Sequence, residues 1–403
     1  MKPRPPALAF IFITLFLDVL GLGLIIPILP KLIESFSNNN VSAAATTVGI
    51  LAGLYALMQF IFAPILGSLS DRYGRRPIIL ISLFGSACDY LLLAFAPSLP
   101  WFFVGRILNG ISGANITAAT AYIADISPPE KRAANFGIIG AAFGLGFIAG
   151  PALGGWLGDH DLRLPFYVAS GLTLANWLYG FFVLPESLAP ENRRAFSWSR
   201  AHPAGSITAL RQYPLVLRLA VAIFLITIAQ MMLQSTWALY TDFRYEWSPK
   251  QVGLSLAFVG LMAALVQGGL ARKIIPKLGE QRSMTTGLTL GTLAQIGYGF
   301  APRGWMLYPA LTIGCLGGIA QPAGQSLISR HVPANEQGAV QGALTSLTSV
   351  AGIIGPLIAT NLFGWFIGPR APFPLPGISF FVAALLMFAA LFLARRAFRL
   401  GAG

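Results

Sequence analysis

Charged residues are scarce in this 403-residue chain: they make up 10% of it, whereas a soluble domain carries about 25%. Because 55% of the residues are hydrophobic, there is too little charged surface to cover a core of this size in water. The sequence has 2 cysteines and 3 histidines, and they show neither metal-ligand spacing nor a disulfide pattern. The sequence therefore indicates a membrane protein that is not an enzyme, with no catalytic residues and no metal site.

Long apolar runs predict about twelve membrane-spanning helices, each close to the ~20 residues that cross ~30 Å of hydrocarbon. Glycine and proline are frequent in these runs, and no ten-residue alternation appears, which excludes the strands of a membrane barrel. The predicted spans cover residues 8–30, 46–68, 77–96, 99–122, 135–157, 164–184, 214–240, 251–271, 283–301, 305–325, 339–360 and 376–394.

The net charge of +13 does not predict a nucleic-acid partner, because the basic residues are unevenly distributed. With an even number of spans, both termini lie on one side of the membrane. Most of the 27 lysines and arginines fall on that side. Such an excess is typical of cytoplasmic loops. We therefore expect a multi-pass protein with the lipid bilayer as its partner and both termini in the cytoplasm.

The sequence repeats itself with an offset of 205 residues. The triplet Phe-Ala-Pro occurs at 95–97 and again at 300–302, and the same offset joins Gly74 to Gly279 and Gly113 to Gly318. We therefore predict an all-α membrane protein with two pseudo-symmetric six-helix bundles. Parallel repeats are typical of transporters, with the substrate path between the halves. The predicted domains are residues 1–184 and 214–403, joined by a polar cytoplasmic linker at 185–213.

Two segments predict contacts between helices. "GSLSDRYGRRPIIL" (67–80) joins the second and third spans, and Asp71 and Arg75 within it predict a charge pair with a neighbouring helix end that breaks as the halves move. For Arg72 and Arg76, a loop that simply follows the positive-inside rule is the alternative. "GAAFGLGFIAGPALGG" (140–155) predicts a closely packed helix seam, or packing without further function. Its candidate residues are Gly146, Gly150, Pro151 and Gly154.

The segment "RILNGISGANITAATAYIAD" (106–125) holds an arginine inside a predicted span. A guanidinium at membrane depth needs acceptors or a counter-charge, so Arg106 and Asn109 are predicted to face inward. An arginine bonded only to backbone carbonyls is the alternative. Around such a site, neutral polar groups and an apolar wall could line a substrate cavity, although each could equally join two helices. The candidates are Gln59, Gln230, Gln234 and Trp237.

These segments and the repeat resemble the major facilitator superfamily. Within it, four stretches are similar to the bacterial tetracycline/proton antiporters, and the likeness covers nearly the whole chain. It is weakest in the linker and the last span. The four stretches are "LDVLGLGLIIPILPKL" (17–32), "LYALMQFIFAPILGSLSDRYGRRPI" (54–78), "GRILNGISGANITAATAYIADI" (105–126) and "ANEQGAVQGALTSLTSVAGIIGPL" (334–357).

The resemblance implies a monomer in the bacterial inner membrane that exports a tetracycline in exchange for protons. It implies no cofactor, although the drug travels as a complex with a divalent cation such as Mg²⁺. The implied functional residues are Asp18, Asp71, Arg75, Asp89, Arg106 and Asp125, with Asp71, Arg75 and Asp125 forming a conformational switch.

Two positions depart from the family pattern. The family has an acid in the ninth span, where this chain has Gly291, and a histidine in the eighth span, where this chain has Ala263 nearby. Either the coupling chemistry lies in the N-terminal half, or the substrate is another amphipathic molecule. The alternatives are another antibiotic, a siderophore or a metabolite.

Asp18 and Asp89 lie well inside predicted spans, where a carboxylate costs roughly 2.5–3.5 kcal/mol. Both share a helical face with small or polar residues, so both are predicted to face the bundle interior. A carboxyl group in low-dielectric surroundings readily holds a proton, which a cationic substrate or Arg106 would displace. This exchange is the chemistry of a proton antiporter. A plain hydrogen bond to a neighbouring helix is the alternative for each acid.

Overall fold

The computed structural model describes residues 6–113, 115–128, 132–194, 196, 213–333 and 337–400. Within these ranges every regular element is a helix, so the predicted all-α class is confirmed. Much of the predicted linker at 185–213 lies outside the described residues, which there comprise 185–194, 196 and 213.

Nine helical stretches of the described chain are long and apolar enough to cross a membrane. They account for nine of the predicted spans, and the 21-residue helix α12 (Glu280–Phe300) covers a tenth. The nine stretches run over Leu8–Ile25, Val41–Tyr73, Arg75–Phe95, Asn135–His160, Leu164–Val183, Pro214–Tyr245, Pro249–Leu278, Val340–Ile367 and Ile378–Arg399.

Each of the two remaining predicted spans comprises two helical segments. The span at 99–122 consists of α5 (Pro100–Ser112) and α6 (Asn115–Ile126), and the span at 305–325 consists of α13 (Leu307–Gly317) and α14 (Ala320–Arg330). A glycine follows the first helix of each pair, at Gly113 and Gly318. Glycine weakens a helix because it loses the most backbone entropy on folding.

Contacts divide the chain into two compact units. The first comprises 1–32, 54–203 and 248–257, and the second comprises 33–53, 204–247 and 258–403. Each unit thus combines most of one predicted bundle with a segment from the other sequence half. The division of the sequence at 185–213 stays a prediction. The elements α2 (Leu29–Phe36), α3 (Val41–Tyr73) and α10 (Pro249–Leu265) each contribute to both units.

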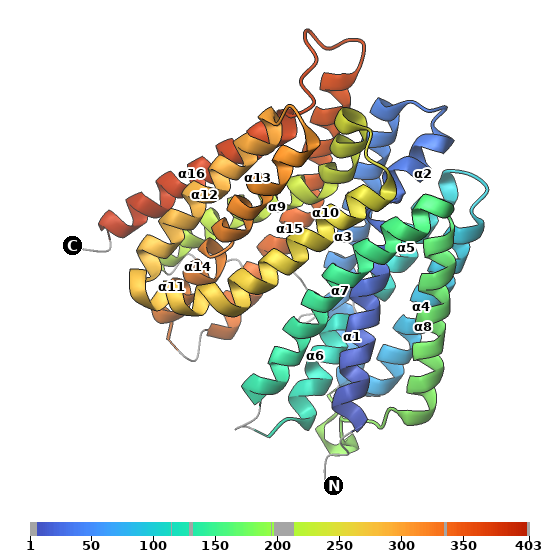
Figure 1. Cartoon of the computed structure of the whole chain (residues 1–403). Coiled ribbons are helices and arrows are strands. Elements are labelled where there is room, and N and C mark those ends of the chain that lie inside the picture. The colour runs from blue at the N-terminus through green and yellow to red at the C-terminus, as the bar shows by residue number, and fades with distance from the viewer. Residues whose placement is uncertain are drawn as a thin grey trace. The chain divides into compact units, whose positions relative to one another are not determined.

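In the first unit, α1 packs along α7 and α8, and α4 packs along α8 and α5 (Figure 1). The packing of α1 on α7 is close because glycine faces glycine: a Cβ at Gly150 would lie 2.8 Å from the Cα of Gly23. Gly146 also allows a close approach, because a Cβ there would lie 2.8 Å from the Cβ of Val19. The other predicted seam residues, Pro151 and Gly154, lie against Gly23 and the backbone of Leu24. The bounds are α1 Pro6–Ile25, α4 Arg75–Phe95, α7 Arg132–His160 and α8 Leu164–Val183.

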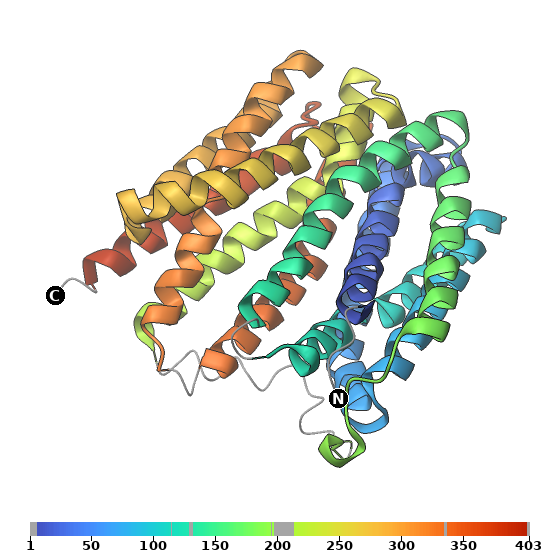
Figure 2. The same cartoon turned by 60° about the horizontal axis from the view of Figure 1, so that its bottom comes forward.

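In the second unit, α9 lies beside α15 and α16, and α12 packs along α16 and α13 (Figure 2). Apolar side chains from these helices and from α14 form a buried core, in which Leu219, Leu288 and Ala323 are fully buried. The bounds are α9 Pro214–Tyr245, α11 Ala271–Leu278, α15 Gln337–Ile367 and α16 Ile378–Leu400, with a π-helical turn at Val266–Leu270 and 3-10 turns at Gly304–Met306 and, in the first unit, Pro190–Asn192.

The sequence repeat is also a repeat of structure. Helices α4 and α12 both have 21 residues, and each begins directly after a glycine of positive φ. The φ angle is 107° at Gly74 and 78° at Gly279, and residues other than glycine rarely adopt such values. The offset of 205 residues therefore joins equivalent points of the two units.

Candidate functional site

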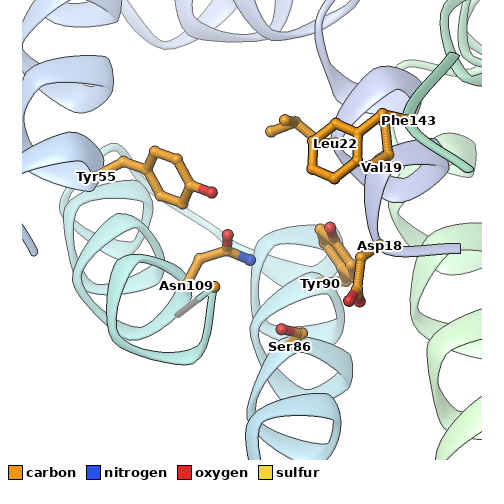
Figure 3. Close-up of a pocket in the computed structure, with 9 residues that line it drawn as sticks. Asp18, Val19, Leu22, Tyr55, Ser86, Tyr90, Asn109 and Phe143 are labelled. Atoms are coloured by element: carbon orange, nitrogen blue, oxygen red, sulfur yellow. The ribbon is translucent and has the colours of Figure 1, made fainter. Parts of the chain in front are cut away.

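A cavity of about 60 Å³ lies inside the first unit, with Asp18 on its wall. Tyr55 and Asn109 line one side, and Asp18 and Tyr90 line the other (Figure 3). Asp18 is half-buried, whereas Asn109 is 6% exposed. The structure thus brings together two of the residues predicted from sequence, one on α1 and one on α5. The remaining lining residues are Val19, Leu22, Ser86, Gly113 and Phe143.

Asp89 lies behind this cavity and is fully buried. The side-chain amide of Asn109 donates a hydrogen bond of 2.6 Å to Asp89 Oδ2. Arg106 Nη2 lies 3.9 Å from the same oxygen, at the outer limit of an ion pair. Asp89, Asn109 and Arg106 therefore form one network, and one carboxylate oxygen is shared by a neutral and a charged partner.

This network is incompletely satisfied. Among the residues that the structure describes, Asp89 Oδ1 and the Nε and Nη2 atoms of Arg106 have no hydrogen-bond partner. Asp89 Oδ1 instead lies against Gly105, where a Cβ would come within 2.6 Å of it. A buried polar atom without a partner costs about 1–3 kcal/mol, more when it is charged. The network can therefore gain stability from a proton or from a polar ligand group.

Aromatic side chains that were not predicted from the sequence complete the site. The Tyr55 hydroxyl accepts a hydrogen bond of 2.8 Å from the predicted residue Gln59, and the Tyr55 ring lies 5.8 Å from the guanidinium carbon of Arg106. Tyr90 is buried beside Gly21 of α1. Tyr55 stands one helical turn before Gln59, and Tyr90 follows Asp89, so both could have been found by extending the predicted polar faces.

The predicted switch residues lie together near the junction of α3 and α4. Arg75 Nη1 lies 2.6 Å from Asp71 Oδ1, and Arg75 Nε lies 3.2 Å from Asp125 Oδ2 at the end of α6. Arg75 also donates a hydrogen bond of 2.6 Å to Ser70 Oγ. We call Asp71, Arg75 and Asp125 the switch cluster. Arg75 is the shared partner, so the movement of one carboxylate changes the environment of the other.

Three predicted substrate-cavity residues are not among those that line the cavity of the first unit. Gln230, Gln234 and Trp237 all lie on α9 in the second unit. Gln234 is exposed and Gln230 is partly buried, whereas Trp237 is 2% exposed and packs edge-on against Tyr298 and Phe380. Trp237 therefore belongs to an aromatic core in the structure described, and its predicted contact with substrate stays a prediction.

The second unit is apolar at Gly291, where the resemblance implied an acid. Gly291 is buried, and the Cε atom of Met387 on α16 occupies the space that a Cβ would need. A carboxylate at this position would displace Met387.

In the described residues, no group of three or more His, Cys, Asp or Glu side chains is placed to hold a metal ion.

The model of the Major Facilitator Superfamily matches residues 11–356. The chain belongs to the Major Facilitator Superfamily. The predicted fold and the prediction that the chain is a transporter rather than an enzyme are thereby confirmed. A crystal structure of the human organic anion transporter MFSD10 (TETRAN) matches with a TM-score of 0.71 and 27% identity over 97% of this chain and 100% of that one. The nucleoside transporter NupG has the same fold, with a TM-score of 0.78 at 13% identity over 97% and 99% of the two chains.

Among relatives in this superfamily, the tetracycline resistance protein of class C from Escherichia coli is 40% identical over 357 residues, which cover 89% of both chains. The class B protein from the same organism is 38% identical and covers 86% of both. The multidrug resistance protein 2 of Bacillus subtilis is 30% identical over 87% of this chain and 86% of its own length. The chain is thus similar to bacterial drug-resistance proteins over almost its full length.

Proposed function

We propose that this superfamily member exports a tetracycline from the cytoplasm in exchange for protons. The observation that carries the proposal is the carboxylate of Asp18 on the wall of an otherwise largely apolar and aromatic cavity. An acid in such a place binds either a proton or a cationic group, and exchange of one for the other couples their movements. The similarity to tetracycline resistance proteins of classes B, C, D and H supports the choice of drug.

Asp18 and Asp89 have different roles in this mechanism. Asp18 reaches the cavity and meets substrate or proton directly, whereas Asp89 lies behind Asn109 and is reached through it. When a substrate group accepts a hydrogen bond from the side-chain amide of Asn109, Asp89 loses its nearest hydrogen-bond donor. Arg106 is then the closest remaining charge to Asp89. Loss of the Asn109 donor would favour the protonated form of Asp89, because a hydrogen bond to a carboxylate stabilises its charged form, and Arg106 alone would then oppose this protonation.

The cavity must widen for a drug to enter. Its volume of about 60 Å³ has room for a few water molecules, whereas sites for drug-sized ligands occupy about 300–1,000 Å³. A divalent cation bound to the drug counts here as part of the substrate. The protein works as a monomer in the bacterial inner membrane, with both termini cytoplasmic and the switch cluster on the cytoplasmic side.

The test is the drug susceptibility of an efflux-deficient host that expresses the protein, across tetracyclines and unrelated drugs. We expect raised resistance to at least one tetracycline, and in inverted vesicles we expect uptake to fall when a chelator removes divalent cations. Unchanged susceptibility at confirmed expression would contradict the proposal.

A second candidate is export of a different amphipathic molecule. It is favoured by the apolar surroundings of Gly291 and by the similarity to a multidrug resistance protein of Bacillus subtilis. Resistance to unrelated drugs without resistance to any tetracycline would favour this candidate.

A further inference from the structure

The repeat places an ion pair at the same point of both units, with the charges reversed. In the first unit, Arg75 begins α4 and pairs at 3.2 Å with Asp125 near the end of α6. In the second unit, 205 residues later in each case, Glu280 begins α12 and pairs at 3.0 Å with Arg330, the last residue of α14. The base and the acid have exchanged helices.

The two pairs differ in their relation to the helix dipoles. The N-terminus of a helix stabilises a negative charge and its C-terminus stabilises a positive one. Glu280 in the first turn of α12 and Arg330 in the last turn of α14 both follow this preference. Arg75 and Asp125 both oppose it. The start of α4 therefore needs a negative charge from another part of the chain.

Glu186 supplies this charge. It lies after α8, in the first part of the predicted linker. Its Oε1 accepts a hydrogen bond of 2.9 Å from the backbone N–H of Arg75, and its Oε2 accepts one of 3.3 Å from that of Arg76. Gly74 leaves space for the carboxylate, because a Cβ there would meet Glu186 Oε2. Glu186 thus caps α4 from outside the helix.

The same linker segment reaches the switch cluster at two further points. Ser187 Oγ donates a hydrogen bond of 3.0 Å to Asp125 Oδ2, the oxygen that also meets Arg75. The backbone N–H of Arg194 donates one of 3.0 Å to the backbone carbonyl of Asp71. Residues 186–194 therefore contact all three members of the cluster.

We propose that Glu186 is a positioning residue of the transport cycle. Its carboxylate holds the start of α4 in the arrangement in which Arg75 meets both Asp71 and Asp125. The linker therefore takes part in the switch, in addition to connecting α8 to α9. The transport measurements that test this inference rest on the proposed function, whereas the amide-exchange measurement does not.

The test compares Glu186→Gln with Glu191→Gln. Glu191 lies in the same segment and is exposed, so its variant removes the same charge without touching α4. In Glu186→Gln we expect amide exchange in residues 75–78 to rise roughly ten- to hundredfold, as for the loss of charge-assisted hydrogen bonds. We expect the transport rate to fall while the dissociation constant of tetracycline stays near the wild-type value. Glu191→Gln should match the wild type in all three measurements.

A second substitution tests the dipole argument. Arg76→Glu in the Glu186→Gln background puts an acid into the first turn of α4, as Glu280 does in α12, and should restore slow exchange. If Glu186→Gln does not fold, Glu186→Asp, which keeps the charge on a shorter side chain, should show a smaller rise in exchange. Wild-type exchange in Glu186→Gln, or an equal rise in Glu191→Gln, would overturn the inference. If the wild type moves no tetracycline, the proposed function is refuted. The comparison of amide exchange between Glu186→Gln and Glu191→Gln then still decides whether Glu186 caps α4.

Discussion

The side-chain amide of Asn109 donates a hydrogen bond of 2.6 Å to the carboxylate of Asp89, and the same amide borders the cavity. Asp89 is 0% exposed, so a ligand in the cavity reaches it through Asn109. A substrate group that accepts a hydrogen bond from the Asn109 amide therefore competes with the Asp89 carboxylate for that donor. Substrate occupancy and the protonation of a buried acid are linked in this way.

Asp18→Asn and Asp89→Asn remove the titratable group and keep the volume and hydrogen-bonding ability of the side chain. We expect at least one of them to abolish uphill export driven by a pH gradient and to retain substrate exchange down its own gradient. Proton flux and drug uptake measured together in reconstituted vesicles check this. A double variant that still accumulates drug from a pH gradient alone would contradict the role of both acids in proton coupling.

Asn109→Ala removes the donor to Asp89 and leaves a buried carboxylate oxygen without its closest partner. We expect the protein to lose about 1–3 kcal/mol of stability. Gln59→Ala is the matched control, because Gln59 donates to the neutral hydroxyl of Tyr55 in a less buried place. Its cost should be about 0.5–1.5 kcal/mol. Unfolding temperatures of the purified variants in detergent measure the difference, and a larger loss for Gln59→Ala would contradict this account of Asp89.

Asp71→Asn and Arg75→Ala break the switch cluster without touching the cavity. Transport should be lost in both variants, because the conformational change depends on these pairs, while equilibrium binding of tetracycline stays within a few-fold of wild type. The two quantities are measured as flux in vesicles and as ligand binding in detergent. Loss of binding by a correctly folded variant would assign these residues to the substrate site instead.

Gly74→Ala and Gly279→Ala test the repeat at equivalent points. Both glycines have positive φ, so alanine should cost about 1–3 kcal/mol at either position. The cost at Gly74 should be larger, because the new methyl group also displaces the Glu186 carboxylate, whereas no described atom lies within 4 Å of a Cβ at Gly279. Gly171→Ala, in α8 with similar open space, should instead stabilise by about 0.5–1 kcal/mol. Equal losses at Gly74 and Gly279 in thermal unfolding would count against the Glu186 cap.

Hydropathy and the 205-residue offset predicted most of the fold, because membrane helices and a repeat leave strong local patterns. The division of two spans into two helical segments each was not predicted, because Gly113 and Gly318 are two among 44 glycines, most of which do not end a helix. The sequence marked Asp18, Asn109 and Asp89 individually by their polarity inside spans. Only packing decides that Asn109 stands between the cavity and Asp89, because that relation depends on the rotation of α4 and α5 about their axes.

Glu186 illustrates a different limit. Its partners, the backbone N–H groups of Arg75 and Arg76, are more than a hundred residues away in sequence, and backbone groups carry no residue-specific signal. Trp237 shows a related limit. The sequence predicts a place for its ring in a substrate wall, whereas its contacts with Tyr298 and Phe380 depend on how the helices pack and could not be predicted.

The reversed ion pair also bears on the ancestry of the chain. If both halves descend from one duplicated six-helix gene, they began with the same charge order, and one copy later changed two positions. After either change alone, two like charges face each other across the helix ends, as two acids or as two bases. The route between the present pairs therefore passes through a repulsive intermediate or through a neutral residue. A reconstructed ancestor with a neutral side chain at one of these four positions would record that passage.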